Sequence, residues 1–251
     1  MKCVFIMGTA GSGKSTLVLS LVDRISDPEV SVATLNLDPG VRWLPYPPDV
    51  DIRDYVDYDR LAEAYRLGPN GALIASVDAS VSHIGEIKGE LEKLGADYVL
   101  VDTPGQMELF AYRSAGKAIA SALSEGDFST VFLADSIFLN RPSDFVSILL
   151  LSYSIQTRFQ APLVGCISKS DLLPAEVYEK AKLWITDPEY LRDDFFSERG
   201  GLDVEFSGRV LDALVEIGVL GEFIFTSSNT GEGLDDLYAQ LQRIHSGGEN
   251  Q

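Results

Sequence analysis

The chain has 251 residues, of which 45% are hydrophobic and 23% are charged, as in an ordinary globular protein with ample material for a core. Its formal net charge of −18 opposes direct binding to nucleic acid or to anionic membranes, because both need clustered Lys and Arg. No apolar run approaches the roughly 20 residues of a membrane helix, and the N-terminus leads straight into a glycine-rich motif, so we expect a cytoplasmic protein without a targeting segment.

Apolar, β-branched runs alternate with segments of helical spacing along the chain. Strands are expected at residues 2–7, 30–37, 97–102, 129–135, 162–168 and 222–227. Helices are expected at residues 14–25, 71–94, 109–124, 141–159, 174–184, 202–217 and 233–244. This order predicts an α/β fold, a mostly parallel sheet with helices on both faces. The link between the second and third predicted strands is long enough for a crossover helix, so these two strands are expected to be parallel.

We expect a single domain over residues 1–245, followed by a flexible tail over 246–251. Two insertions are expected within it, one over 39–94 and a peripheral helical one over 174–217. The stretch 39–70 is the least regular, with five prolines, and such segments are usually functional or mobile. The acidic stretch 186–199 is expected to form a solvated peripheral helix.

The sequence GTAGSGKS, residues 8–15, matches the pattern G-x-x-x-x-G-K-[ST] between a predicted strand and a predicted helix. Gly8 and Gly13 allow backbone angles that turn successive N–H groups inward, and the helix adds its positive end, so the loop binds phosphate. Lys14 is expected to reach the β- and γ-phosphates, and the Ser15 hydroxyl to bind Mg²⁺. A glycine-rich structural turn would leave Lys14 and Ser15 unexplained. The nucleotide-binding residues expected here are Gly8, Ala10, Gly11, Ser12, Gly13, Lys14, Ser15 and Thr16.

The sequence DTPGQ, residues 102–106, follows another apolar strand. Asp102 therefore emerges at the carboxyl edge of the sheet, where ligands bind in open α/β folds, and is expected to bind the same Mg²⁺. The backbone N–H of Gly105 is placed to turn toward a γ-phosphate. Gln106 is a candidate for orienting water, although an exposed Gln has many ordinary explanations.

Two further strand ends carry a candidate base-binding site. Ser168, Lys169 and Asp171 resemble the Asn-Lys-x-Asp guanine motif of GTPases, with Ser168 in the Asn position. The Asp171 carboxylate matches the two donors of guanine, which adenine lacks. After the last strand, Ser228 and Asn229 lie in a segment, TSSNTGEG, that resembles the motif whose backbone contacts the guanine carbonyl. Together these motifs favour GTP over ATP.

The combination of GTAGSGKST, NLDPG, GPNGA, DTPGQMELF, SKSD and SSNTGEG resembles the GPN-loop GTPases, and most closely their archaeal members. The resemblance implies a homodimer in which Gly68, Pro69 and Asn70 reach the partner's active site. It also implies that Asp38 acts near Mg²⁺ and the attacking water. GTP or GDP and Mg²⁺ are the implied cofactors. The family's link to RNA polymerase assembly implies a protein client.

Alternatives to this interpretation stay open. Taken alone, Gly-Pro-Asn is a surface turn before a helix that Asn70 caps, and Asp38 caps a turn. A P-loop kinase acting on a small acceptor would explain residues 8–15, but it would not explain DTPG or SKSD. A scaffold that binds GTP with little turnover would share every motif.

Overall fold

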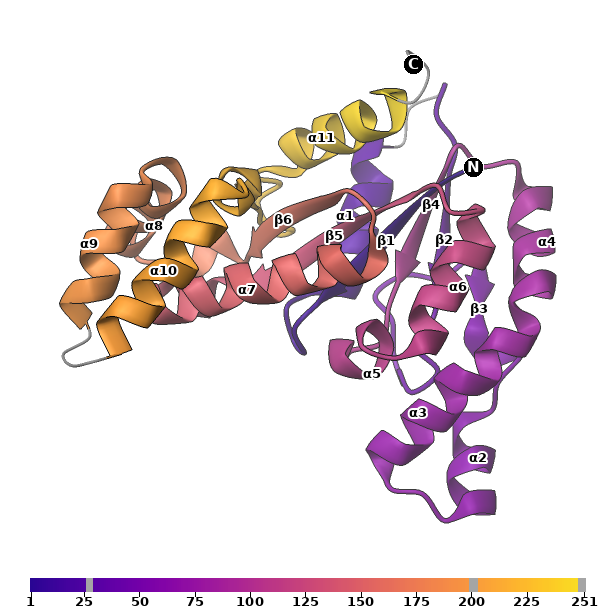
Figure 1. Ribbon diagram of the computed structural model, residues 1–251. Helices are drawn as coiled ribbons and strands as arrows, with labels where there is room; N and C mark the ends of the chain where they lie inside the picture. Colours follow the sequence, from indigo (N-terminus) through magenta and orange to yellow (C-terminus); the bar gives the residue numbers. More distant parts are fainter. Residues whose placement is uncertain (26–28, 199–202, 248–251) are drawn as a thin grey trace.

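The computed structural model of the protein describes residues 1–25, 29–198 and 203–247. Within these ranges, seven strands form one sheet in the order β3-β2-β4-β1-β5-β6-β7, and all neighbouring strands are parallel (Figure 1). The strands are β1 (Lys2–Gly8), β2 (Val32–Asn36), β3 (Val50–Asp51), β4 (Tyr98–Asp102), β5 (Phe128–Asp135), β6 (Leu163–Ser168) and β7 (Phe223–Phe225). The predicted α/β class is confirmed, as is the parallel pairing of the second and third predicted strands, which are β2 and β4.

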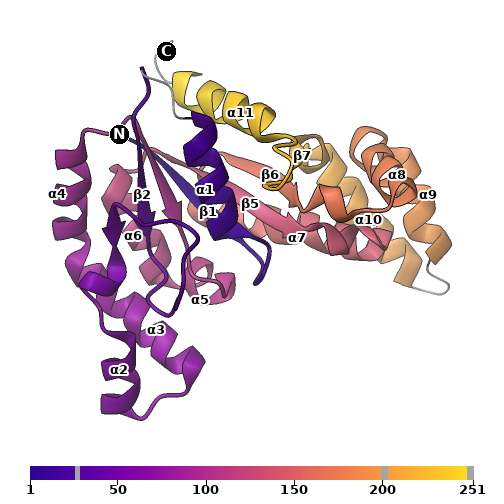
Figure 2. The same cartoon turned by 180° about the vertical axis from the view of Figure 1, so that it is seen from behind.

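Helices cover both faces of this sheet. The α-helices are α1 (Lys14–Ile25), α2 (Tyr58–Tyr65), α3 (Pro69–Ser80), α4 (Ile84–Leu94), α5 (Met107–Ala111), α6 (Ser114–Ser124), α7 (Pro142–Phe159), α8 (Ala175–Thr186), α9 (Pro188–Glu198), α10 (Asp203–Glu216) and α11 (Leu234–Ser246). The 3₁₀ segments are η1 (Ile52–Asp54), η2 (Val81–His83), η3 (Ser136–Leu139), η4 (Ser170–Leu172) and η5 (Val219–Glu222). Helices α1 and α11 lie on one face, in front of the sheet in Figure 2, and α4, α6 and α7 lie on the other.

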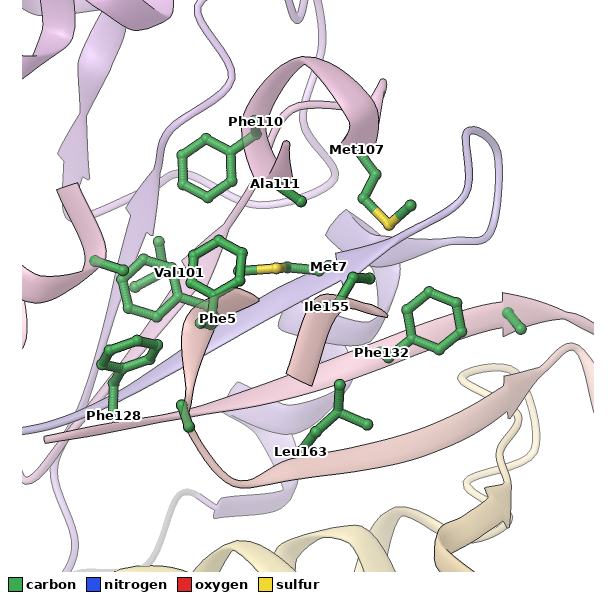
Figure 3. Close-up of a cluster of buried hydrophobic side chains, with 14 of the residues drawn as sticks. Phe5, Met7, Val101, Met107, Phe110, Ala111, Phe128, Phe132, Ile155 and Leu163 are labelled. Atoms are coloured by element: carbon green, nitrogen blue, oxygen red, sulfur yellow. The ribbon is translucent and has the colours of Figure 1, made fainter. Parts of the chain in front are cut away.

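The side chains of β1 alternate between two hydrophobic cores. Val4 and Ile6 pack with α1 and α11, whereas Phe5 and Met7 pack on the opposite face, beside Phe110 of α5 (Figure 3). All four β1 side chains are fully buried. Because each such side chain contributes roughly 1.5–3 kcal/mol through burial, the central strand is held from both sides. The loop that follows β1 therefore starts from a fixed point at the carboxyl edge of the sheet.

The insertion over 39–94 is more regular than its sequence suggests. It contains β3 and α2, which the prolines and acidic clusters obscured. The single helix predicted over 71–94 is wrong, because η2 separates α3 from α4. The hydroxyls of Ser80 and Ser82 donate to the carbonyls of Ser76 and Ala79 at 2.8 and 2.7 Å, and hydroxyl bonds of this kind bend helices. Figures 1 and 2 both show α2 and α3 extending beyond the edge of the sheet.

The Gly-Pro-Asn tripeptide forms the start of α3. Gly68 is the N-cap, with φ −73° and ψ 173°, and Pro69 occupies the first helical position. Proline suits that position because its missing N–H would have no intrahelical partner there. Asn70 therefore lies inside the first turn, and the expectation that it caps the helix is wrong.

The helical insertion packs onto α7 through α8, α9 and α10. The predicted peripheral helix over 186–199 exists as α9, and residue 199 lies outside the described residues. It is less solvated than expected, because Leu191 and Phe195 are buried. Trp184 of α8 donates its indole N–H to Asp194 of α9 at 2.7 Å. The same ring stacks on Phe145 of α7, with ring centroids 5.9 Å apart.

At the C-terminus, α11 continues through His245 to Ser246. Residues 248–251 of the predicted tail lie outside the described residues, and so do residues 199–202 of the predicted insertion. The division into one domain with two insertions stays a prediction. In the part of the chain that the structure describes, we find no helix with the length and apolarity that crossing a bilayer requires.

Candidate functional site

The glycine-rich loop joins β1 to α1 at the carboxyl edge of the sheet. Gly13 has a φ of +90°, which L side chains rarely adopt. Gly8 is constrained by packing, since an added Cβ would lie 2.1 Å from the Leu133 carbonyl oxygen. The hydroxyls of Thr9 and Ser12 are buried without a hydrogen-bond partner among the described residues. Buried polar atoms without partners are rare, so this loop has unused polar groups that suit an anionic ligand.

Lys14 lies at the centre of the loop and is 6% exposed. Its ammonium donates to the carbonyls of Gly8 and Thr9, both at 3.1 Å, and to the carbonyl of Gly105 at 3.3 Å. Burial lowers the pKa of Lys14, and the nearby carboxylates of Asp102 and Asp38 oppose that shift. The ammonium thus connects the glycine-rich loop to the segment that follows β4. Its predicted contact with phosphate stays a prediction.

Asp102 ends β4 and is 2% exposed. Burial raises its pKa to about 6, although a hydrogen bond from Ser15, the charge of Lys14 and a hydrogen bond from Tyr46 all act to lower it. The Tyr46 hydroxyl donates to Asp102 Oδ2 at 3.2 Å. Mg²⁺ prefers hard oxygen ligands and one or two protein groups beside phosphate oxygens, so Ser15 and Asp102 fit this ion. Tyr46 was missed because nothing in a proline-rich loop marks a tyrosine as buried.

Asp38 and Gly105 are in direct contact although they are far apart in the sequence. The Asp38 carboxylate accepts from the N–H of Gly40 at 2.9 Å through Oδ1 and from the N–H of Gly105 at 3.0 Å through Oδ2. The Gly40 bond is the turn-capping role that the sequence offered as the alternative for Asp38. The Gly105 bond adds a contact between the segments after β2 and β4. A half-buried carboxylate held by two backbone amides is fixed in direction.

A cavity of about 240 Å³ adjoins Asp38 and is lined by four of the residues predicted for hydrolysis, Asp38, Pro69, Asn70 and Gln106. It is lined by Ala10, Asp38, Gly40, Tyr58, Pro69, Asn70, Leu73, Gly105 and Gln106. The Tyr58 hydroxyl of α2 donates to the carbonyl of Pro69 at 3.2 Å, which holds the start of α3 at this cavity. Pro69 and Asn70 therefore lie beside Asp38 of their own chain. Gly68, the cap of α3, is not part of the lining.

A second cavity, of about 310 Å³, lies on the other side of the glycine-rich loop. It is lined by Ser12, Gly13, Thr16, Leu17, Leu133, Ser168, Lys169, Asp171, Leu172, Thr226, Ser228 and Asn229. The two segments predicted to bind the base, 168–171 and 228–229, thus meet at one place, beside the predicted phosphate loop. They follow the neighbouring strands β6 and β7, which explains why they are distant in sequence and close in space.

Lys169 is held in the left-handed backbone region, with a φ of 58°. Its ammonium donates to the Gly11 carbonyl at 2.8 Å and to Asp135 Oδ2 at 2.6 Å. This side chain therefore joins the base cavity to the glycine-rich loop. Asp135, at the end of β5, was missed because a single Asp after a strand has no distinctive pattern.

Asp171 is exposed at the mouth of this cavity. A hydrogen bond from Ser227 is the main cause that lowers the pKa of Asp171, so the carboxylate is ionised and accepts hydrogen bonds. Asn229 Nδ2 lies 3.5 Å from Asp171 Oδ2. The Ser168 hydroxyl, in the Asn position of the guanine motif, donates to the Ala134 carbonyl of β5 at 3.1 Å, so its hydrogen bond is made within the sheet.

Glu232 joins the two loops that carry these base-binding residues. It accepts from the Ser170 hydroxyl at 2.6 Å and from the Tyr178 hydroxyl at 2.5 Å, while its carbonyl accepts from the Ser227 N–H at 3.0 Å. Glu232 lies in the segment TSSNTGEG, but its position two residues after a polar turn carries no signal of this contact.

Comparison with known proteins gives consistent matches over nearly the whole chain. A family model described as "Conserved hypothetical ATP binding protein" matches residues 6–246. The "GPN-loop GTPase PAB0955" of Pyrococcus abyssi is 32% identical over 241 residues, which are 93% of each chain. "GPN-loop GTPase 1" of Schizosaccharomyces pombe is 32% identical over 244 residues, which are 93% of this chain and 66% of the relative's length. The crystal structure of PAB0955 in its apo form, described as a GTPase, has a TM-score of 0.83 and 30% identity, and the match covers 97% of both chains.

Proposed function

The chain belongs to the GPN-loop GTPase family, and we propose that it binds GTP with Mg²⁺ and hydrolyses it as a homodimeric switch whose Gly-Pro-Asn loop acts on the partner subunit. GTPase activity follows from the family. The roles of single residues, the metal, the dimer and the switch are the proposed part. Support for them comes from the two cavities on either side of residues 8–15.

The phosphate end of the nucleotide is assigned to the buried side. The backbone N–H groups of residues 8–15 and the start of α1 stabilise phosphate charge, and Lys14 adds a positive charge that moves from carbonyl oxygens to phosphate oxygens. Once the nucleotide is bound, these groups are in place before the reaction, so they stabilise charge that develops on the transferred phosphoryl group without further reorganisation.

Ser15 and Asp102 would hold Mg²⁺ together with phosphate oxygens. When bound, this ion neutralises charge on the β- and γ-phosphates. Asp38 is proposed to orient the attacking water from the adjoining cavity, and Gln106 at the same cavity to assist it. The N–H of Gly105 is proposed to donate to the γ-phosphate, in exchange for its bond to Asp38.

The base end is assigned to the exposed side. Asp171 is proposed to accept from the guanine N1–H and the exocyclic amine, and Lys169 to lie along the base. Ser228 and Asn229 are proposed to contact it through their backbone. The family model's description mentions ATP, whereas an ionised acceptor at this position favours guanine, because adenine does not offer two donors there.

The dimer is proposed to form through the part of the chain that carries α2 and α3. Every residue of α2 is at least partly exposed, and Tyr65 at its end is 68% exposed. Asn70 is exposed, so it is accessible to a second subunit as well as to its own cavity. A small amide donor at the start of α3 would stabilise phosphate charge less than an arginine does.

We also propose that the protein acts on a client protein in complex assembly and that it is cytoplasmic. The sequence does not identify the client. A P-loop kinase and a scaffold without turnover were the alternatives, and the family assignment supports hydrolysis over both.

The observation that carries the proposal is the convergence of Lys14, Asp38 and Gly105 beside one cavity and of Lys169 and Asp171 at the other. The test is steady-state hydrolysis of GTP and ATP with Mg²⁺, with and without small acceptors. Hydrolysis of GTP that is faster than that of ATP and independent of acceptors is expected. Transfer of phosphate to an acceptor, or equal use of ATP, would contradict the proposal.

A further inference from the structure

The backbone of Asp38 is held on both sides by one buried side chain. Asn36 is the last residue of β2 and is 0% exposed. Its Oδ1 accepts from the N–H of Asp38 at 3.0 Å, and its Nδ2 donates to the carbonyl of Asp38 at 3.2 Å. Since both backbone groups of Asp38 are used, the direction of its side chain depends on how the Asn36 amide is oriented.

That amide is also held by the neighbouring strand. Asn36 pairs in register with Asp51 of β3, and its Nδ2 donates to Asp51 Oδ1 at 2.9 Å. A carboxylate only accepts hydrogen bonds, so the NH₂ end of Asn36 must face Asp51. The oxygen end accepts from the Asp38 N–H, so the bonds to Asp51 and to the Asp38 backbone require the same orientation of the amide. Replacing Asp51 with an amide would remove the charged acceptor that holds the NH₂ end of Asn36 and so weaken this arrangement.

Asp51 is in turn held by Arg53. The guanidinium donates from Nη2 to Asp51 Oδ2 at 2.6 Å and from Nε to both carboxylate oxygens at 3.0 Å. Burial acts to raise the pKa of Asp51, but hydrogen bonds from Arg53 and Asn36 outweigh it and keep the pKa below its usual value. The remaining nitrogen, Nη1, donates to the carbonyl of Val41 at 3.2 Å, three residues after Asp38. Arg53 therefore contacts one end of the segment 38–41 directly, at Val41, and is linked to the other end, at Asp38, through Asp51 and Asn36.

We propose that Asp51 and Arg53 are positioning residues for Asp38, which fix the segment 38–41 so that the Asp38 carboxylate stays on the Gly105 N–H side of the cavity. The proposal rests on the proposed role of Asp38 in hydrolysis. The set Asn36, Asp51 and Arg53 is called the Asp38 clamp below. An ordinary ion pair at the edge of the sheet would stabilise β3 without affecting the reaction.

The geometry explains why an arginine is needed in the clamp. Its planar group bridges a carboxylate and a carbonyl at the same time, whereas a lysine offers one point charge. Arg53→Lys therefore keeps the charge beside Asp51 but loses the second contact, to Val41. Misplacement of a catalytic group by 1 Å costs up to about 100-fold in rate, so partial loss of the clamp should reduce kcat by roughly 10-fold.

The experiment compares Arg53→Lys and Asp51→Asn with Arg42→Lys in the full-length chain. Arg42 and Asp59 form a bidentate pair at 2.6 and 2.7 Å in the same insertion, but both side chains are largely exposed, and the pair makes no contact with Asn36 or Asp38 among those that the structure shows. The two clamp variants should lose roughly 10-fold in kcat while GDP affinity stays within about twofold, and the Arg42 variant should match the parent. Thermal unfolding of each variant shows whether it is folded.

A second measurement, which does not depend on hydrolysis, monitors the backbone amides that bond to Asp38. Hydrogen–deuterium exchange of peptides that cover 38–41 and 103–106 should be faster in Arg53→Lys and Asp51→Asn, since the Gly40 and Gly105 amides both bond to Asp38. Arg42→Lys should leave exchange in both peptides unchanged. Unchanged exchange in folded clamp variants would overturn the proposal, even if their kcat falls.

Variants of Asp38 distinguish a failure of the clamp proposal from a failure of the proposed role of Asp38 in hydrolysis. Asp38→Asn with parental turnover would reject the role of Asp38 in hydrolysis. A slow Asp38→Asn beside fully active clamp variants would reject the clamp alone. In the Asp38→Asn background, adding Arg53→Lys should cause little further loss, because both changes act on one group. The same fold-loss in both backgrounds would show that Arg53 acts elsewhere and would overturn the proposal.

Discussion

The two ends of the nucleotide site are built in different ways. At the phosphate end, Lys14 and Asp102 are almost fully buried and already bonded to protein groups. At the base end, Asp171 is exposed, and its contacts come from the loop that carries Ser227 and Asn229. Buried groups that are fixed in advance suit the stabilisation of a transition state, whereas exposed acceptors suit selection among bases. Changes at the first end should alter the rate, and changes at the second should alter the affinity.

The largest effect is expected at Lys14. Lys14→Ala removes the buried positive charge of the phosphate end and should lower GTP turnover by on the order of 10³-fold or more. Steady-state phosphate release measures this loss. Lys88→Ala is the matched control, because Lys88 of α4 pairs with Glu125, which follows α6, on the face of the sheet opposite α1. Full activity in a folded Lys14→Ala chain would reject the phosphate assignment.

At the base end, Asp171→Asn should weaken GTP binding by about 100-fold, since two hydrogen bonds to a charged acceptor are lost. The variant should gain affinity for xanthosine triphosphate, whose base offers an acceptor where guanine has an amine. Calorimetric titration with both nucleotides measures the change. Parental affinity for GTP in this variant would mean that the cavity beside Asp171 does not hold the base.

The burial of Asp102 gives a pH dependence of stability. The folded-state pKa of Asp102, about 6, lies above its usual value of 3.8, so the folded state holds this proton more tightly than the unfolded state does. This contribution to the free energy of unfolding is fully present below pH 4 and is lost as the pH rises through 6, because the buried carboxyl then becomes charged. Asp102→Asn avoids this loss and should be more stable than the parent at pH 8 by on the order of 2 kcal/mol, without nucleotide and with a chelator present. The difference should disappear below pH 4. Urea unfolding from pH 4 to 8 measures it, and a pH-independent difference would contradict the raised pKa.

A smaller effect is expected at Asn70. Asn70→Ala removes one neutral amide donor and should lower kcat by roughly 10-fold while GDP binding is spared. Mixing this variant with an Asp38→Asn chain tests whether the loop acts on the partner. If it does, mixed dimers regain activity at one of their two sites. If activity in the mixture equals the average of the two variants, Asn70 acts on its own chain, where it lines the same cavity as Asp38.

The sequence predicted the strand ends and their motifs because each motif is local. Residues 8–15 carry their own backbone requirements, and Asp102 and Asp171 follow apolar runs that could only be buried strands. The structure brings these predicted residues together at one edge of the sheet, as parallel strands require. Their roles in binding and hydrolysis stay proposals.

What the sequence did not predict depends on contacts between distant segments. Tyr46 reaches Asp102 from a loop whose prolines suggest irregularity, and Asn36, Asp51 and Arg53 meet because a two-residue strand, β3, pairs with β2. So short a strand has no periodicity to detect. The break between α3 and α4 was missed because no proline interrupts residues 71–94 to mark it.

The difference between the two ends is tested most directly by the rate at which bound GTP is hydrolysed in a single turnover. Asp171→Asn, saturated with GTP, should hydrolyse it at close to the parental rate. Asp38→Asn should bind GTP as the parent does and hydrolyse it roughly 100-fold more slowly. If saturated Asp171→Asn were as slow as Asp38→Asn, the division between a reactive end and a selective end would be wrong.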